Sequence, residues 1–342
     1  MKKYFKKIGL LTFSYLPSGF KISAYNLLGA KIKKGTYLGL GTYLLPYYSD
    51  YKNVFIGDKT SIGDNVVISA KEVRIGAESE IRNNVKITGE SNFFMGDSCY
   101  VGENSIINLR RDVEIGNETC IGANCSLYTH GLWLPALDGY PVKFGKITVG
   151  DKAWISASSF IMPGISVGKN AVIGSGSIVT KNVADNSVVA GNPAKEIKKI
   201  EPLKRLSPDE KNAILKGLIA EFINRFRERI TVLEDSENIS RFQMSFKERK
   251  LGLFPKTENR TIIYEKETSS DSIAKHAKNK GDAGVILISL NINNELKETC
   301  KKKGIHWINI GERKSHLDSG RISSLIKASF RNNGFKFVSD QE

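Results

Sequence analysis

The stretch AWISASSFIMPGISVGKNAVIGSGSIVTKNVADNSVVAGNPAKEI, residues 153–197, shows most clearly the pattern that decides the fold of this chain. Aliphatic residues recur in it at every sixth position: Ile155, Ile161, Val167, Ile173 and Val179. A period of six fits neither an amphipathic helix, whose period is 3.6, nor an array of two-stranded hairpins. It is typical of a parallel β-helix, in which three short strands form one triangular coil.

The same spacing continues through most of the first two hundred residues, where the aliphatic positions group in threes that we call triplets of anchors. The triplets are Ile32/Leu38/Leu44, Ile56/Ile62/Ile68, Ile75/Ile81/Ile87, Met95/Val101/Ile107, Ile115/Ile121/Leu127, Val149/Ile155/Ile161 and Val167/Ile173/Val179. They predict about seven triangular coils. Glycine often follows an anchor, as in Ile56-Gly57, and we expect it to permit a tight corner.

A second register supports the first, because small or β-branched residues stand four positions after the anchors. They are Thr36, Thr60, Val66, Ser79, Val85, Cys99, Ser105, Thr119, Cys125, Ala153, Ser159, Ala171 and Ser177. We expect them to fill the core between the coils. The four cysteines of the chain show no CxxC spacing, so neither a zinc site nor a disulfide framework is predicted.

Extra residues interrupt the repeat at one place only, after the third anchor of a triplet. The insertions cover residues 45–55, 69–74, 88–94, 108–114 and 128–148, and we expect all of them at the same corner of the column. The longest, residues 128–148, contains His130, the one histidine of the repeat region. A long loop on a rigid scaffold is where function concentrates.

With its repeat, its YTHG segment at residues 128–131 and the stretch at 153–197, the chain resembles the hexapeptide-repeat acyltransferases. The resemblance covers roughly residues 30–200 and is strongest to the galactoside, maltose and polysaccharide O-acetyltransferase branch. It implies a left-handed parallel β-helix, acetyl-CoA as the acyl donor, and a homotrimer whose active sites lie between neighbouring subunits. It implies no metal, and one histidine in the repeat cannot supply the ligands of a β-helix carbonic anhydrase.

By the same resemblance, two residues match catalytic positions. His130 matches the histidine that takes a proton from the acceptor hydroxyl, a role suited to an imidazole near neutral pH. Asn108 matches an asparagine that touches the acceptor, although it could instead satisfy the backbone of a turn. Asp138 is the only carboxylate of the loop, and it either orients His130 or forms the turn in LDGYP.

The coenzyme positions implied by the resemblance are Trp154, Ala157, Ser175, Thr180, Lys181, Lys195 and Lys198. Trp154 would line the cleft, and the backbone N–H of Ala157 would serve the thioester or the oxyanion. Lys195 and Lys198 stand where the galactoside enzymes have arginine. Lysine keeps the charge for phosphate but loses the planar stacking surface. The alternative for these two lysines is a solvated helix face.

The chain divides into three parts. Residues 1–30 form a basic, amphipathic segment, residues 31–200 the β-helix, and residues 201–342 a helix followed by a small α/β domain. In the last part, Ser207-Pro208-Asp209-Glu210 is a capping box. Ile214, Leu215, Leu218, Ile219, Phe222 and Phe226 then mark one face of a helix. The strand-like segments TIIY, GVILISL, IHWINI and FKFV alternate with helix-like residues 271–280, 293–303 and 319–332, which predicts a largely parallel sheet.

The chain has 51 Lys and Arg against 36 Asp and Glu, a formal charge of +15. The basic residues are dispersed, so we expect no nucleic-acid partner. Lys2, Lys3, Lys6 and Lys7 border the apolar residues 8–16, which are too few to span a bilayer. This segment either rests on an anionic membrane face or packs on its own domain. Cytoplasmic residence is the default expectation.

The function predicted from these observations is acetyl transfer from acetyl-CoA to a sugar hydroxyl of a bacterial-type surface polysaccharide, such as a capsule, an O-antigen or a precursor. Transfer would be direct, with His130 as general base. N-acetylation of an amino sugar or a nucleotide amino sugar is the alternative enzyme, because the same base can deprotonate an amine. A trimeric scaffold without catalysis is the alternative outside enzymes. The sequence leaves the acceptor sugar and the role of residues 201–342 open.

Overall fold

The protein is described by a computed structural model that covers residues 12–47, 50–131, 136–200, 206–235, 239–248, 256–265, 268–269, 271, 284–289, 292–309, 314–316, 322, 325–326 and 338–339. The chain forms two compact units, Met1–Leu203 and Lys204–Glu342. The predicted basic segment lies in the first unit, and its first eleven residues fall outside the described ranges. No helix among the described residues has the length and apolar character that crossing a membrane requires.

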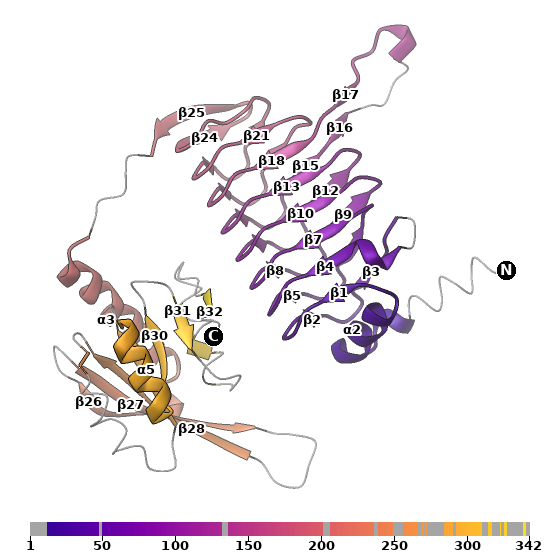
Figure 1. Ribbon diagram of the computed structural model, residues 1–342. Helices are drawn as coiled ribbons and strands as arrows, with labels where there is room; N and C mark the ends of the chain where they lie inside the picture. The colour runs from indigo at the N-terminus through magenta and orange to yellow at the C-terminus, as the bar shows by residue number, and fades with distance from the viewer. Residues whose placement is uncertain are drawn as a thin grey trace. The chain divides into compact units, whose positions relative to one another are not determined.

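The first unit is a column of triangular coils whose sides are three parallel sheets (Figure 1). Sheet A contains β1 (Lys31–Ile32), β4 (Val54–Ile56), β7 (Val73–Ile75), β10 (Phe93–Met95), β13 (Val113–Ile115), β18 (Ile147–Val149) and β21 (Ser166–Val167). Sheet B contains β2 (Tyr37–Leu38), β5 (Ser61–Ile62), β8 (Glu80–Ile81), β11 (Tyr100–Val101), β14 (Cys120–Ile121), β19 (Trp154–Ile155), β22 (Val172–Ile173), β24 (Ser187–Gly191) and β25 (Ala194–Lys199). Sheet C contains β3 (Tyr43–Leu44), β6 (Val67–Ser69), β9 (Lys86–Gly89), β12 (Ile106–Leu109), β15 (Ser126–Tyr128), β20 (Phe160–Ile161) and β23 (Ile178–Val179).

The anchors of each triplet pair with the same anchors of the next coil. Ile32 pairs with Ile56 in sheet A, Leu38 with Ile62 in sheet B, and Leu44 with Ile68 in sheet C. The anchors are buried, and the small or β-branched residues of the second register are buried as well. The arrangement is consistent with the predicted left-handed β-helix, and the insertions all leave from the corner between sheets C and A.

The reason that we expected for the glycines after the anchors is wrong. The left-handed backbone conformation falls two residues further along, at positions such as Lys59 (φ 55°) and Asn84 (φ 61°). Gly57 is not among the residues with positive φ, but a Cβ added there would lie 2.5 Å from the backbone nitrogen of Ala77 in the next coil. Glycine is therefore needed because adjacent coils approach closely at this position.

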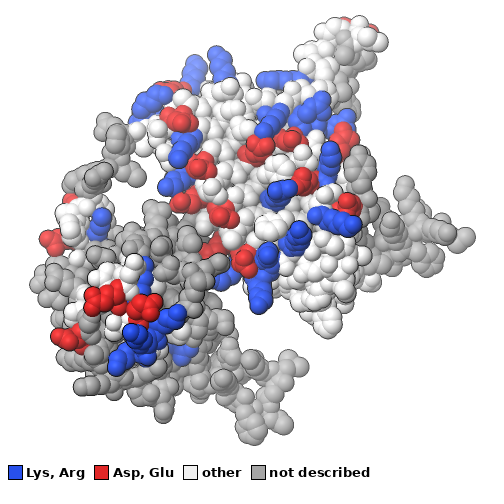
Figure 2. Space-filling view, in the orientation of Figure 1, with Lys and Arg blue, Asp and Glu red and all other residues white. Residues whose placement is uncertain are grey.

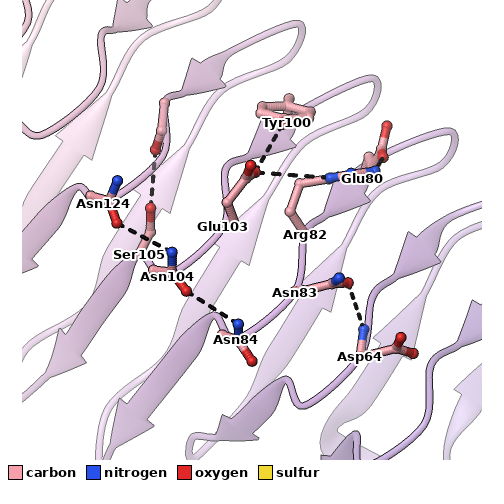
Figure 3. A network of polar contacts seen from close by, with 11 residues as sticks. Asp64, Glu80, Arg82, Asn83, Asn84, Tyr100, Glu103, Asn104, Ser105 and Asn124 are labelled. Atoms are coloured by element: carbon pink, nitrogen blue, oxygen red, sulfur yellow. Dashed lines mark hydrogen bonds and ion pairs between the residues drawn. The ribbon is translucent and has the colours of Figure 1, made fainter.

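Asparagines at the left-handed positions stack into a ladder along one corner of the column (Figure 3). The Asn84 Nδ2 group donates to Asn104 Oδ1 at 3.2 Å, and Asn104 Nδ2 donates to Asn124 Oδ1 at 3.3 Å. Asparagine adopts this conformation more readily than most residues. On the nearby face of sheet B, Arg82 pairs with Glu80 at 2.7 Å, so much of the surface charge is neutralised locally.

Helix α2 (Ser18–Leu27) covers the end of the column where the first coil begins. Its buried side chains, Lys21 and Tyr25, are four residues apart and therefore share one face. The Lys21 ammonium donates to the main-chain oxygens of Ser14 (3.0 Å) and Gly39. The Tyr25 hydroxyl accepts the N–H of Leu44 at 3.0 Å. These bonds satisfy backbone groups that the first coil would otherwise leave without a partner.

The second unit begins with helix α3 (Pro208–Arg225), whose capping box at Ser207 and Glu210 is confirmed. Leu215, Ile219 and Phe222 are buried as predicted, whereas Ile214 is 45% exposed and does not belong to the buried face. A second helix, α5 (Asn294–Lys303), confirms the helix predicted at 293–303 and has Asn293 as its N-cap. The helix-like segments 271–280 and 319–332 lie almost entirely outside the described residues.

The prediction of a largely parallel sheet in this unit is wrong, because the sheet is mixed. Its order is β26 (Ile230–Asp235), β27 (Ile239–Glu248), β28 (Lys256–Glu265), β29 (Gly284–Ser289), β30 (His306–Asn309), β31 (Lys314–His316) and β32 (Val338–Ser339). The β26/β27, β27/β28 and β30/β31 pairs are antiparallel, and the other three pairs are parallel. In β27, Phe242, Met244 and Phe246 alternate with polar residues, so the sequence contained a strand signal that the prediction missed.

Candidate active site

His130 lies in a small antiparallel hairpin that projects from the column (Figure 1). The hairpin consists of β16 (His130–Gly131) and β17 (Lys143–Phe144), and the 3-10 turn η2 (Ala136–Asp138) lies between them. Residues 132–135 of the loop are outside the described ranges. His130 is half-buried and pairs with Phe144 across the hairpin.

The residue before His130 fixes the hairpin to the column. Thr129 is fully buried, and its hydroxyl donates to the main-chain oxygen of Asn108 at 2.8 Å. The same hydroxyl accepts the N–H of Arg111 at 3.0 Å, and the Thr129 carbonyl accepts the N–H of Gly145 at 3.0 Å. Three separate segments are therefore joined at the residue adjacent to His130.

Aromatic rings lie on both sides of the His130 imidazole. The Phe144 ring stacks with it at 6.4 Å between centroids, and the Tyr128 ring lies 6.1 Å away at 41°. Tyr128 in turn stacks on Phe160 of the next coil at 5.5 Å and 12°. The His130 imidazole therefore lies among aromatic side chains.

Two buried polar atoms at this place have no hydrogen-bond partner, namely His130 Nδ1 and Asn108 Oδ1. Asn108 is aligned with Tyr128 across β12 and β15, so Asn108 and His130 belong to neighbouring coils of one face. Leaving a buried polar atom unpaired is costly, which points to a group supplied by a ligand or by another chain. Asp138 lies in η2 and does not satisfy His130 Nδ1, which favours the turn over an orienting role.

Three of the predicted coenzyme positions lie on sheet B or at the corner that follows it. Trp154 in β19 is 52% exposed on the outer face of sheet B. Ala157 and Ser175 are exposed at equivalent turn positions of adjacent coils. At this corner of the first two coils, an Asx side chain of the next coil accepts the exposed N–H, as Asn83 Oδ1 does for Asp64 at 2.8 Å (Figure 3). The residue of the next coil at this position is Ser175 and not Asp or Asn. No described residue accepts the N–H of Ala157.

The other predicted coenzyme positions lie further along the column. Thr180 and Lys181 follow β23 and are exposed. Lys195 and Lys198 are exposed on β25, which pairs antiparallel with β24, so the helix alternative for these lysines is wrong. No hydrogen bond, ion pair or ring contact among the described residues joins this group to His130 or Asn108. The single chain thus presents Trp154 and Ala157 on or beside sheet B, and His130 and Asn108 beside sheet C, the sheet whose last strand precedes Thr180 and Lys181.

Sequence patterning did not single out Thr129, Phe144, Tyr128, Phe160 or Arg111. A usable signal existed for Thr129, because alternation along a strand turns the neighbour of an outward-facing histidine toward the core. Phe144 contacts His130, which is 14 positions away, and Arg111, which is 33 positions away. No periodic pattern relates these residues.

The comparisons with known proteins concern the column. Residues 146–181 match the family described as bacterial transferase hexapeptide (six repeats). The galactoside O-acetyltransferase of Escherichia coli is 33% identical over 136 residues, which are 37% of this chain and 63% of that protein. The chloramphenicol acetyltransferase of Klebsiella aerogenes is 50% identical over 64 residues, which are 19% of this chain and 30% of that protein.

In both relatives the match spans less than two thirds of their own length. A solved structure described as galactoside acetyltransferase in complex with coenzyme A is 22% identical, covers 58% of this chain and 82% of that chain, and has a TM-score of 0.33. These matches show that the matched part of the column is similar to hexapeptide-repeat transferases.

Proposed function

We propose that the protein is an acetyl-CoA-dependent acetyltransferase that transfers the acetyl group to a sugar hydroxyl of a surface polysaccharide or its precursor. The observation that carries the proposal is the pair of unpartnered buried atoms, His130 Nδ1 and Asn108 Oδ1, on one face beside the hairpin. The named acetyltransferases among the relatives support the reaction class, and the galactoside enzyme supports a sugar as acceptor.

His130 acts as the general base in this proposal. Its neutral imidazole takes the proton of the acceptor hydroxyl, and the oxygen attacks the thioester carbonyl of acetyl-CoA. The carbon–sulfur bond then breaks, and the imidazolium returns the proton to the leaving thiolate. The rings of Tyr128 and Phe144 hold the imidazole in place, and the Asn108 amide oxygen accepts a hydrogen bond from another hydroxyl of the sugar.

The donor binds along the groups on sheet B and at the far end of the column. The free N–H of Ala157 polarises the thioester carbonyl and stabilises the oxyanion that forms on attack. Trp154 offers an exposed ring for the pantetheine arm, with Ser175 and Thr180 as polar contacts. Lys181, Lys195 and Lys198 are exposed cations suited to the phosphates.

Because one chain carries Trp154 and Ala157 at sheet B but His130 and Asn108 beside sheet C, we propose that a complete site forms between subunits of a homotrimer. One subunit would supply His130 and Asn108, and its neighbour would supply Trp154 and Ala157. Cytoplasmic residence, with the basic N-terminus against the inner face of the membrane, remains part of the proposal.

The test is acetyl transfer from radiolabelled acetyl-CoA to sugars by the full-length wild type and by His130→Ala. We expect transfer by the variant to fall roughly 10²- to 10⁴-fold, which is the usual contribution of a general base. Coenzyme A binding, measured by calorimetry, should be unchanged. Near-wild-type transfer by His130→Ala would contradict the assignment.

The same experiment separates the alternative functions. An alkali-labile product indicates an ester and hence O-acetylation, whereas a stable product indicates an amide and hence N-acetylation of an amino sugar. A wild type that binds no coenzyme A even at millimolar concentration would be the result expected of a non-catalytic scaffold.

A further inference from the structure

Four basic side chains surround the base of the His130 hairpin, and only two of them are neutralised. Arg110 Nη1 lies 2.5 Å from Glu90 Oε1, and Lys146 Nζ lies 2.7 Å from Glu114 Oε1. Arg111 and Lys143 form no ion pair with any residue that the structure describes. On the face of the column seen in Figure 2, basic and acidic side chains are interspersed.

The Arg111 side chain is exposed but held in place. Its guanidinium carbon lies 4.9 Å from the centroid of the Phe144 ring, and Nη1 donates to the main-chain oxygen of Arg110 at 2.8 Å. Its own main-chain N–H is bound by the buried Thr129 hydroxyl at 3.0 Å. A guanidinium has five N–H donors, so most of them remain for a ligand. Because the guanidinium group is already oriented, less side-chain conformational entropy is lost when a ligand binds.

Arg111 is also close to the proposed base. The Phe144 ring contacts both groups, and its distances to the Arg111 guanidinium and to the His130 centroid limit their separation to about 11 Å. That separation is within the reach of one or two sugar rings. A substituent of the acceptor can therefore meet Arg111 while a hydroxyl of the same acceptor meets His130.

We propose that Arg111 binds an anionic group of the acceptor, a carboxylate or a phosphate, so that the preferred substrate is an acidic sugar. The inference rests on the proposed acetyltransferase function and names the class of its acceptor. A planar guanidinium without a counterion suits bidentate binding of carboxylate or phosphate. An uncharged acceptor cannot form such an ion pair with the Arg111 guanidinium.

The test compares three acceptors with a galactose-type ring: methyl galactoside without charge, methyl galacturonide with a carboxylate at C6, and galactose 1-phosphate with a phosphate on O1. We expect the wild type to prefer one of the charged sugars. Arg111→Gln should lower kcat/KM for that sugar roughly 10- to 150-fold, as expected for a lost hydrogen bond to a charged group, and change the neutral sugar less than about twofold. Arg111→Lys should restore part of the lost kcat/KM for the charged sugar, because lysine keeps the positive charge but cannot form the bidentate hydrogen bonds of a guanidinium group.

Lys71→Gln serves as the charge-matched control, because Lys71 is an exposed cation at the same corner of a different coil. It should leave the preference unchanged. An equal loss for charged and neutral sugars in Arg111→Gln would overturn the proposal, since it would mean that Arg111 only supports Phe144. Preference of the wild type for the neutral sugar would overturn it as well. Comparison of kcat/KM for methyl galacturonide and for galactose 1-phosphate identifies whether a carboxylate or a phosphate is recognised.

Failure of the acetyltransferase function is distinguished by a binding measurement without turnover. If the wild type transfers acetyl to no sugar, the proposed function fails. Calorimetry of the three sugars still tests Arg111. Tighter binding of a charged sugar, weakened by Arg111→Gln and by added salt, supports anion recognition, and equal binding of all three contradicts it.

Discussion

The hydroxyl of Thr129 donates to the main-chain oxygen of Asn108 at 2.8 Å, across the boundary between two adjacent coils. It thereby sets the distance between the backbone of the proposed acceptor-binding asparagine and the backbone of the residue that precedes the proposed base. Thr129 is fully buried, so this relationship is protected from water. We regard Thr129 as a positioning residue, because it reaches the reaction only through Asn108 and His130.

Replacing Thr129 by valine should remove this bond with little change in volume. The Arg111 N–H and the Asn108 oxygen then lose a partner, which should cost about 1–3 kcal/mol of stability. We expect kcat to fall while KM for acetyl-CoA stays constant, because Thr129 contacts none of the proposed donor-binding residues among those that the structure describes. Urea unfolding and initial rates measure both effects. Thr129→Ser keeps the hydroxyl and should recover most of the activity; equal losses in the two variants would contradict the positioning role.

Trp154 should matter for the donor and hardly at all for folding. Its side chain is 52% exposed, so Trp154→Ala should leave the midpoint of unfolding nearly unchanged. The loss of an aromatic contact should raise KM for acetyl-CoA roughly two- to tenfold. Trp154→Phe should show a smaller rise. A change in KM for the sugar alone would instead place Trp154 on the acceptor side.

Gly57 should tolerate no side chain. A Cβ at this position would lie 2.5 Å from the Ala77 nitrogen and 2.6 Å from the Gly76 carbonyl carbon, which are backbone atoms of the next coil. We expect Gly57→Ala to destabilise the column by at least about 2 kcal/mol, as overpacking does. Gly19→Ala is the matched control, because nothing lies within 4 Å of a Cβ there and the residue is in helix α2. Thermal unfolding should show a lower Tm for the first variant only.

The second unit should lose stability in alkali. Burial raises the pKa of the Cys300 thiol to about 12, whereas the thiol ionises near 9.0 in the unfolded chain. Above pH 9 the unfolded state therefore holds fewer protons than the folded state, and each further pH unit favours unfolding. The contribution of Cys300 is complete below pH 9 and disappears by about pH 12.

The fluorescence of Trp307, which is buried in the same cluster as Cys300, reports this transition in urea titrations between pH 8 and pH 11. Cys300→Ala should have a shallower dependence of the unfolding free energy on pH. An unchanged slope in this variant would show that another group causes the alkaline loss.

Several features could be predicted from the sequence because they depend on neighbours along the chain or on a constant period. The anchors from Ile32 to Val179 predicted stacked triangular coils, and each anchor lies in a strand of sheet A, B or C. The insertion at 128–148 was recognised as the place of His130. The capping box at Ser207 was equally readable, since it involves residues three positions apart.

Other features required the tertiary structure. The mixed sheet of the second unit was misjudged because β26 and β27 were not predicted, and because strand order is set by packing between residues far apart in the sequence. The role of Gly57 was misassigned because the atoms that exclude a side chain belong to Ala77 of another coil.

The sequence by itself determined the column, because each coil contacts only its neighbours and a six-residue period repeats the same local contacts. It also determined which histidine stands in the long loop. Only the tertiary structure decided what surrounds that histidine: the Thr129 bonds, the rings of Tyr128 and Phe144, and the Arg111 guanidinium. These groups come from different coils and from the returning strand of the hairpin, so their meeting depends on distances in space that no periodic pattern encodes.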